Sequence, residues 1–216
     1  MAVLTISRQF GAGGWTLGKS IADRLQYQFV SAAVINKMAK EANVSAKWIK
    51  SVEKHAGDWL IRFSSKLVSS SFIERHIGEP KADFDEEKYI SFLKNIIGRI
   101  AEEDNVVLLG RGSQYILQNN PNVLNILLVA DLEDRIKFIE NIWNISRREA
   151  EKAIQTREKR RDAFLKYFAQ GHPNSLKLYH LIINTSKMRL DQAEDMIVWM
   201  VKDFEAREKT DESGGH

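Results

Sequence analysis

The sequence predicts an α/β protein in which helices cover both faces of a parallel β-sheet. Two observations support this fold class. Short apolar runs of strand length alternate along the chain with longer segments whose apolar residues recur at helical spacing. A glycine cluster separates the first apolar run from the first helical segment. A phosphate-binding loop between a strand and a helix requires this order.

Composition narrows the classes of protein to consider. The 216 residues are enough for one sizeable α/β domain or for a core with insertions. The absence of cysteine excludes disulfides, thiolate metal sites and a cysteine nucleophile. The N-terminal segment lacks the pattern of a signal peptide, and no apolar run is long enough to span a bilayer. We therefore expect a cytoplasmic protein without a membrane partner.

The elements follow in order from these patterns. Buried strands are predicted at residues 2–8, 105–112, 123–130 and 179–186, and helices at 16–26, 86–104, 113–118, 131–143, 146–170 and 189–207. The chain from 29 to 104 has helical periodicity throughout, and the tail at 209–216 has no apolar face. The predicted organisation is a core of 1–30 and 101–208, a helical insertion at 31–100 and a disordered tail at 209–216.

The glycine cluster contains a phosphate-loop motif. Residues 13–20, GGWTLGKS, satisfy the pattern G-x-x-x-x-G-K-[ST]. In this arrangement backbone N–H groups and a helix N-terminus cradle phosphates. Lys19 would reach the outer phosphates, and the Ser20 hydroxyl would bind a magnesium ion. The alternative is a glycine-rich turn with an incidental lysine.

Arginines elsewhere in the chain could bind the phosphoryl group during transfer. Arg111 directly follows a predicted strand, which puts it at the carboxyl edge of the sheet, where ligands bind in open α/β folds. Arg157 and Arg161 share one face of a predicted helix, with Arg160 close to it. These three would close over phosphates as a lid, although a solvated charged helix explains most such runs. Asp131 follows another strand, where it would cap a helix or lie near a metal ion.

Together these segments resemble the cytidylate kinase-like family of P-loop nucleoside monophosphate kinases. ISRQFGAGGWTLGKSIADRL resembles the start of that family, and VVLLGRGSQYILQNNPNVLNILLVADLEDRI resembles its second and third strands. REKRRDAFLKYF and YHLIINTSKMRLDQAEDMI resemble its lid and its final strand and helix. The resemblance extends over roughly residues 3–200 and implies a three-layer P-loop NTPase fold with a helical NMP-binding insertion and a lid at about 146–172.

The resemblance also implies roles for individual residues. The cofactors would be ATP and Mg²⁺. ATP phosphates would lie on Gly11, Ala12, Gly13, Gly14, Trp15, Thr16, Leu17, Gly18, Lys19 and Ser20, with Arg160 nearby. Arg111 would bind the acceptor phosphate, and Arg157 and Arg161 would stabilise the γ-phosphoryl group in transfer. The sequence departs from the family at Gly112, where cytidylate kinases carry an acidic residue, and at Glu158, where an aspartate is commoner.

The resulting functional hypothesis is ATP-dependent phosphorylation of a nucleoside monophosphate, CMP or dCMP. Its partner would be a small-molecule nucleotide. Three alternatives stay open: a nucleotide-binding regulatory protein with lost or altered kinase activity, a kinase of another small metabolite, and a nucleic-acid-binding protein that uses the basic helix at 146–166. Residues 43–75, with Trp48 and Trp59, are a candidate homodimer surface or a candidate cover for the acceptor site.

Overall fold

The computed structural model describes residues 2–35, 86–168 and 175–213. It divides the chain into two compact units, one formed by Met1–Phe29 with Asp104–His216 and the other by Val30–Glu103. Most of the predicted insertion, including the candidate surface at 43–75, lies outside the described residues, as does the end of the predicted lid at 169–172.

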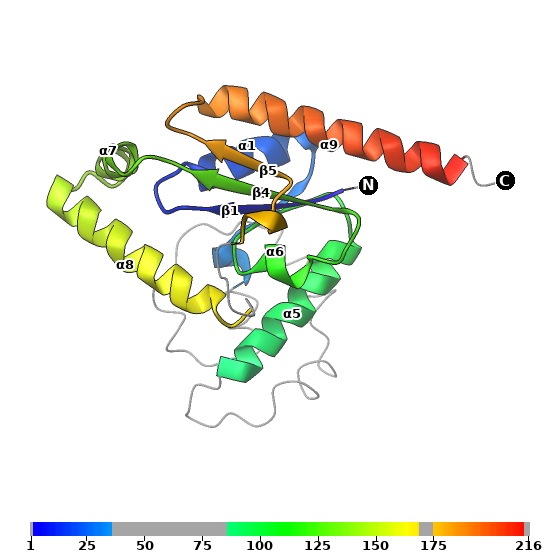
Figure 1. Cartoon of the computed structure of the whole chain (residues 1–216), viewed down its shortest axis with the longest axis horizontal. Coiled ribbons are helices and arrows are strands. Elements are labelled where there is room, and N and C mark those ends of the chain that lie inside the picture. Colours follow the sequence, from blue (N-terminus) through cyan, green and yellow to red (C-terminus); the bar gives the residue numbers. More distant parts are fainter. Residues whose placement is uncertain (1, 36–85, 169–174, 214–216) are drawn as a thin grey trace. The chain divides into compact units, whose positions relative to one another are not determined.

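The described residues form five strands, six α-helices and one short 3-10 helix (Figure 1), and residues 32–35 are also helical. The strands are β1 (Val3–Arg8), β2 (Gln28–Val30), β3 (Val106–Leu109), β4 (Val123–Val129) and β5 (Leu181–Asn184). The helices are α1 (Gly14–Leu25), α5 (Glu86–Glu102), α6 (Ser113–Ile116), α7 (Leu132–Trp143), α8 (Arg147–Leu165) and α9 (Leu190–Ser213), with the 3-10 helix η2 at Leu176–Leu178.

The strands form one sheet in the order β2-β3-β1-β4-β5. β1 pairs in parallel with both β3 and β4, and β4 pairs in parallel with β5. In this register Ile6 lies opposite Leu109. The residues that directly follow β3 therefore lie beside the last residues of β1, although about a hundred residues separate them in sequence.

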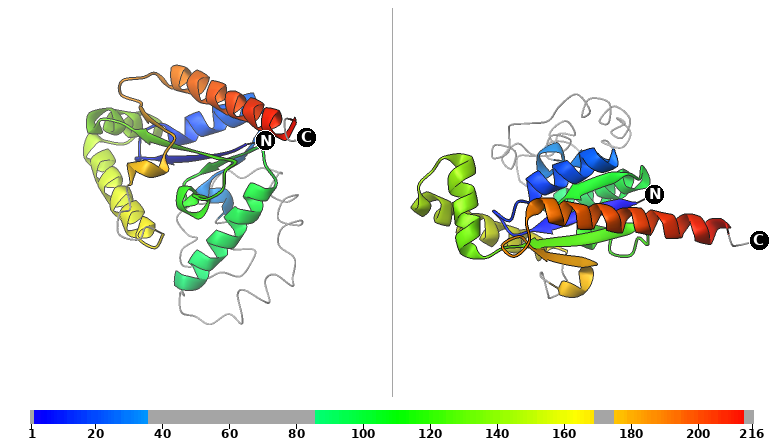
Figure 2. Two further views of the ribbon diagram at one scale, coloured as in Figure 1. Left: turned by 45° about the vertical axis from the view of Figure 1, so that its right-hand side comes forward. Right: turned by 90° about the horizontal axis from the view of Figure 1, so that it is seen from above.

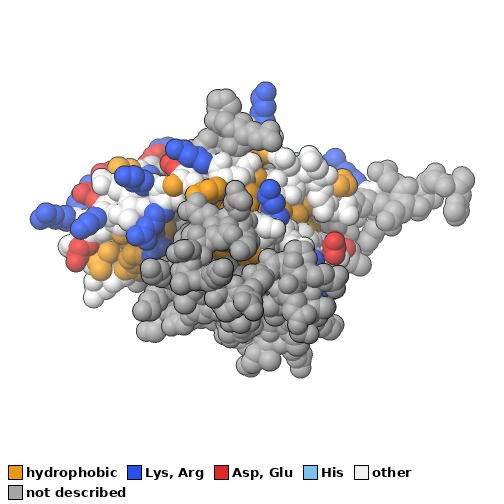
Figure 3. Space-filling view, turned by 90° about the horizontal axis from the view of Figure 1, so that it is seen from below, with side chains coloured by type: hydrophobic (Ala, Val, Ile, Leu, Met, Phe, Trp, Pro, Cys, Tyr) orange, Lys and Arg blue, Asp and Glu red, His pale blue; other side chains and the backbone are white. Residues whose placement is uncertain are grey.

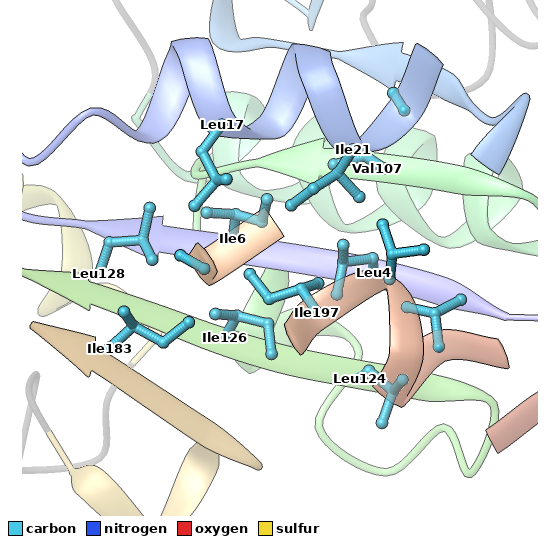
Figure 4. Packing of buried hydrophobic residues seen from close by; sticks show 14 of the residues in the cluster. Leu4, Ile6, Leu17, Ile21, Val107, Leu124, Ile126, Leu128, Ile183 and Ile197 are labelled. Atoms are coloured by element: carbon cyan, nitrogen blue, oxygen red, sulfur yellow. The ribbon is translucent and has the colours of Figure 1, made fainter. Parts of the chain in front are cut away.

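The main core lies on the face of the sheet covered by α1 and α9 (Figure 4). Leu4 and Ile6 of β1 point to this face and are fully buried against Leu17 and Ile21 of α1 and Ile197 of α9. Fully burying such a side chain contributes about 1.5–3 kcal/mol. Because α1 is anchored in this way directly after the glycine loop, the core fixes the position of its N-terminus.

A smaller core holds α7 against α8. It consists of Ile136 and Ile139 of α7 and Ala150 and Ile154 of α8, with Phe10 packed against them. The two views of Figure 2 show α8 following α7 at one end of the sheet. Because Phe10 belongs to the loop after β1, this cluster ties the predicted lid helix to that loop.

Two elements differ from the sequence prediction. The strand β2 lies within a region predicted to be wholly helical. Its three residues give too short an apolar pattern to reveal a strand. The helix α9 continues to Ser213, so the prediction of disorder from residue 209 is wrong for 209–213. The segment lacks an apolar face, but glycine first follows at 214, so nothing in the sequence breaks the helix earlier.

Candidate active site

A glycine-rich loop, residues 9–13, connects the carboxyl end of β1 to the first turn of α1. Gly11 and Gly13 have left-handed backbone conformations, with φ of 90° and 75°, which glycine adopts at little steric cost. Gly13 is the N-cap of α1, and no side chain caps this helix. The first N–H groups of α1 can therefore donate to an anion, which the helix dipole also favours.

The structure does not bring Lys19 and Ser20 to this N-terminus. Both residues lie in the second turn of α1. The ammonium group of Lys19 is paired with the carboxylate of Asp23, one turn further along the helix. The Ser20 hydroxyl donates a hydrogen bond of 2.6 Å to Glu194 of α9. The loop expected to extend to Ser20 therefore ends at Gly13, and the motif match spans mostly helix.

The other residues predicted within the loop are helical for a clear physical reason. Leu17 and Gly18 face the core, where Leu17 is buried and a Cβ on Gly18 would come within 2.9 Å of the Phe29 ring. Trp15 and Thr16 are exposed on the first turn, and the Trp15 ring meets Phe29 edge-on. These four residues belong to α1, so the glycine loop ends at Gly13 and is shorter than the loop predicted from the sequence.

Arg111 lies, as expected, in the turn that directly follows β3. The turn is tight: Gly110, Arg111 and Gly112 all have positive φ, with 59° at Arg111. A non-glycine residue with this φ is uncommon and is held there by its surroundings. Its guanidinium carbon lies 5.8 Å from the centre of the Phe164 ring on α8.

The predicted arginines of α8 occupy different environments. The Arg157 guanidinium stacks on two rings, 4.7 Å from the centre of Phe10 and 5.1 Å from that of Trp143. Arg161 is partly buried, and Arg160 is exposed. The pKa of Arg157 is lowered by burial and by the charge of Arg160. Phe10 and Trp143 thus hold Arg157 of α8 beside the glycine loop.

A further arginine, which the sequence analysis did not single out, lies at the centre of this region. Arg8 is the last residue of β1 and is partly buried. Its aliphatic carbons pass over Gly14, where an added Cβ would meet the Arg8 Cγ at 2.8 Å. Its guanidinium group reaches the turn after β3, where a Cβ on Gly110 would lie 2.1 Å from Nη1. The sequence feature that could have identified Arg8 is its position as a charged residue at the end of an otherwise uncharged strand.

The arginines of the site act on one another electrostatically. Burial lowers the pKa of Arg8 to about 10, and the positive charges of Arg111, Arg161 and Arg157 act in the same direction. The negative charge of Glu158 opposes them. Side chains from β1, the turn after β3 and α8 therefore share one electropositive region.

Glu158 connects α8 to the glycine loop. Its carboxylate accepts a hydrogen bond from the backbone N–H of Phe10, in the glycine loop. The same carboxylate oxygen accepts one from the buried Arg135 of α7, at 3.4 Å. The negative charge nearest to Arg8 is thus already shared with two other donors.

The magnesium role predicted for Ser20 does not fit its position, because its hydroxyl is bonded to Glu194 outside the loop. Asp131 is the N-cap residue of α7, and its carboxylate pairs with Lys187 at 3.2 Å. Among the described residues, no group of three or more histidine and acidic side chains could hold a metal ion. The residues present therefore do not form a protein-built cation site in this part of the chain, and no step below relies on one.

What the region can do follows from its charge. The helix N-terminus, Arg8 and Arg111 meet at the carboxyl edge of the sheet, and α8 adds Arg157 and Arg161. Figure 3 shows Lys and Arg side chains, with Asp and Glu side chains among them, at the end of the molecule where α7 and α8 lie. Such a combination of backbone N–H groups and arginines binds phosphate groups.

The sheet order and the glycine loop that leads into α1 define a P-loop kinase fold. The chain belongs to the cytidylate kinase-like family, whose model matches residues 3–187. No curated protein sequence matches the chain. None of the helices in the described ranges is long and apolar enough to cross a membrane.

Three solved structures are similar to this chain, and the first of them shows the same fold. An uncharacterized protein from Eubacterium ventriosum is similar with a TM-score of 0.65 at 18% identity, over 94% of this chain and 99% of that chain. A shikimate kinase from Acinetobacter baumannii is similar with a TM-score of 0.49 at 12% identity, over 94% of both chains. A gluconokinase from Sinorhizobium meliloti gives 0.47 at 14% identity, over 100% of this chain and 98% of that chain.

Proposed function

We propose that this protein transfers the γ-phosphoryl group of ATP to a nucleoside monophosphate, with CMP or dCMP as the acceptor. The observation that carries the proposal is the convergence of Arg111, Arg157 and Arg161 on one region beside the N-terminus of α1. Membership of the cytidylate kinase-like family supports the same reaction class.

The proposed mechanism relies on positioning and charge. The N–H groups of the loop and of the start of α1 hold the ATP phosphates. Arg111 binds the acceptor phosphate, and Arg157 and Arg161 stabilise the negative charge of the phosphoryl group in transfer. Removal of one preorganised donor of this kind typically costs about 2.7–4 kcal/mol of transition-state stabilisation. Mg²⁺ would enter with ATP, as the family implies, and no residue is assigned to it.

The lid role of α8 rests on contacts within the described structure. Arg157 stacks on Phe10, and Glu158 accepts a hydrogen bond from the Phe10 N–H. Movement of α8 would therefore move arginines and release a loop N–H group at the same time. This coupling suits an enzyme that must exclude water from phosphoryl transfer.

A panel of acceptors tests the proposed function. We expect purified protein with ATP and Mg²⁺ to form ADP only slowly, and CMP or dCMP to stimulate ADP formation at least about tenfold over this background. The measurement is ADP release with CMP, dCMP, UMP, AMP, GMP or hydroxylated metabolites as acceptors. If only a hydroxylated metabolite stimulates ADP formation, the acceptor is not a nucleoside monophosphate and the proposed acceptor class is wrong.

The same panel tests the second candidate, a nucleotide-binding regulatory protein. Gly112 stands where cytidylate kinases carry an acidic residue, and the nearby Glu158 carboxylate is already bonded to Phe10 and Arg135. ATP binding without ADP formation in the presence of any acceptor would contradict the kinase proposal and favour this alternative.

A further inference from the structure

The phosphate loop lacks a lysine at the position where its chemistry needs a cation. In such loops a lysine reaches the outer phosphates from beside the helix N-terminus. Here the first residue of α1 is Gly14, and Lys19 is engaged with Asp23 in the next turn. A cation must still neutralise the charge that phosphoryl transfer spreads over the phosphate oxygens. The question is which residue supplies it.

Arg8 occupies the required place. Its aliphatic carbons pack on Gly14, the residue that opens α1, so its side chain runs alongside the helix N-terminus. Any side chain at position 14 would collide with it, because a Cβ there would approach the Arg8 Cβ, Cγ and Cδ within 2.8–3.2 Å. The glycine at this position therefore makes room for the arginine at the end of β1.

A second glycine receives the guanidinium group. Gly110 has a φ of 77°, and a Cβ at this position would overlap Nη1 of Arg8. Gly110 also donates its N–H to the carbonyl oxygen of Ile6, which joins the turn to β1 at 3.1 Å. Arg8 thus bridges the donor side of the site, at α1, and the acceptor side, at Arg111. The transferred group must pass between these two sides.

The contacts of Arg8 indicate a role other than holding the fold together. A structural arginine in a partly buried place is normally bonded to carboxylates or carbonyl groups. Within 2–35, 86–168 and 175–207, no hydrogen bond or ion pair of the Arg8 side chain with another residue is present. Glu158, the carboxylate that acts on it, is bonded to Phe10 and Arg135 instead.

The electrostatic environment is consistent with a missing anion. Arg111, Arg161 and Arg157 all disfavour the charged form of Arg8, and burial does so most strongly. A bound phosphate would reverse this effect by placing negative charge among four arginines. Such a site favours a highly charged anion and disfavours a neutral ligand.

We propose that Arg8 supplies the cation of this phosphate loop, and that its guanidinium group binds the γ-phosphoryl oxygens of ATP in the ground state and in transfer. The proposal rests on the phosphotransferase function proposed above. In the step itself, the bond between the γ-phosphorus and the β,γ-bridging oxygen breaks, and that oxygen leaves with the electron pair as ADP. A new bond forms between the γ-phosphorus and an oxygen of the acceptor phosphate. Arg8 stays protonated throughout.

The test compares two cations of the same chain. We expect Arg8→Gln to lower kcat about 100-fold or more and to weaken ATP binding about tenfold or more. Arg8→Lys should keep part of the kcat and of the ATP affinity, because lysine retains the positive charge but lacks the planar guanidinium group. Lys19→Gln should lower both much less than Arg8→Gln. Arg24→Gln, which changes an exposed arginine of α1, serves as the matched control.

The readouts separate failure of this proposal from failure of the proposed function. Calorimetric binding of ATP and of inorganic triphosphate is measured beside turnover, and circular dichroism confirms that each variant is folded. If wild type shows no turnover with any acceptor, the proposed function fails, and loss of triphosphate binding in Arg8→Gln still supports the role of Arg8. If folded Arg8→Gln binds ATP and triphosphate as tightly as wild type, the proposed role of Arg8 is wrong. If Arg8→Gln does not fold, two other results would overturn the role of Arg8. One is a folded Arg8→Ala variant with the kcat and ATP affinity of wild type. The other is a larger loss of kcat and affinity in Lys19→Gln than in Arg8→Lys.

Discussion

Arg8 shows how a single residue can matter to a site without standing out in the sequence. It belongs to no recognised motif, and only its place at the end of the central strand distinguishes it from other arginines. Arg111 could be predicted, because glycines flank it after an apolar run. The contact of Arg8 with Gly110 could not, because sheet register brings these two residues together across about a hundred positions.

We expect the charge of Arg8 to lower the stability of the folded protein without ligand. Arg8→Met keeps the packing of the aliphatic carbons and removes a charge that burial and three arginines disfavour. We predict that the variant without ligand melts about 2–4 °C higher than wild type, as a gain near 1 kcal/mol would produce in a chain of this size. Differential scanning fluorimetry at neutral pH measures the shift. A lower melting temperature would contradict the electrostatic argument.

The pH dependence of this difference follows from the direction of the pKa shift. The folded-state pKa of Arg8 is lowered to about 10, well below the ordinary value of an arginine. The charged form therefore destabilises the folded protein fully at pH values below about 10. The penalty decreases as the pH rises through the folded pKa, because Arg8 then loses its proton in the folded state. The advantage of Arg8→Met should accordingly be larger at neutral pH than above about pH 10.

Among the elements, α8 decides how the lid arginines are presented. A capping box fixes its start: the Ser146 side chain accepts from the Glu149 N–H, and the Glu149 carboxylate accepts from the Ser146 N–H at 2.9 Å. Ile154 faces the small core that α8 shares with α7, while Arg157 contacts Phe10. The cap therefore sets which residues of α8 face the glycine loop.

Loss of this cap should destabilise the protein measurably. We predict that Ser146→Ala lowers the free energy of unfolding by about 1 kcal/mol near neutral pH, as for other N-caps. The hydrogen bonds from the Ser146 hydroxyl and N–H lower the pKa of Glu149. This contribution is present above the ordinary pKa of a glutamate and is lost as the pH falls through the lowered value. Urea unfolding of both proteins should thus show a smaller difference in acid; an equal difference at both pH values would argue against the capping box.

The limits of sequence prediction are clearest for α1. The apolar spacing of Leu17 and Ile21 revealed the helix, and both residues are buried in the core. The boundary of the helix was harder to predict, because Lys19 and Ser20 complete a phosphate-loop spacing although both lie within the helix. Packing decides the boundary: α1 begins at Gly14, as soon as the left-handed Gly13 has turned the chain.

For the molecule as a whole, the parallel sheet is what makes a site. It gathers the residues that follow β1 and β3 at one edge, and α8 adds its arginines there. The order of strands and helices in this part of the chain was largely predictable from apolar periodicity, except for the short β2. The acceptor, CMP or dCMP, stays a prediction, because most of the insertion predicted to bind it lies outside the described residues.

The central claim is that ATP binds with its phosphates at the start of α1, among arginines rather than at Lys19. A crystal structure of the protein with a non-hydrolysable ATP analogue tests this claim most directly. We predict that the triphosphate accepts hydrogen bonds from the N–H groups of the glycine loop and the first turn of α1, and that the Arg8 guanidinium contacts the outer phosphate. A triphosphate held by Lys19 and Ser20, or bound away from the carboxyl edge of the sheet, would contradict the account.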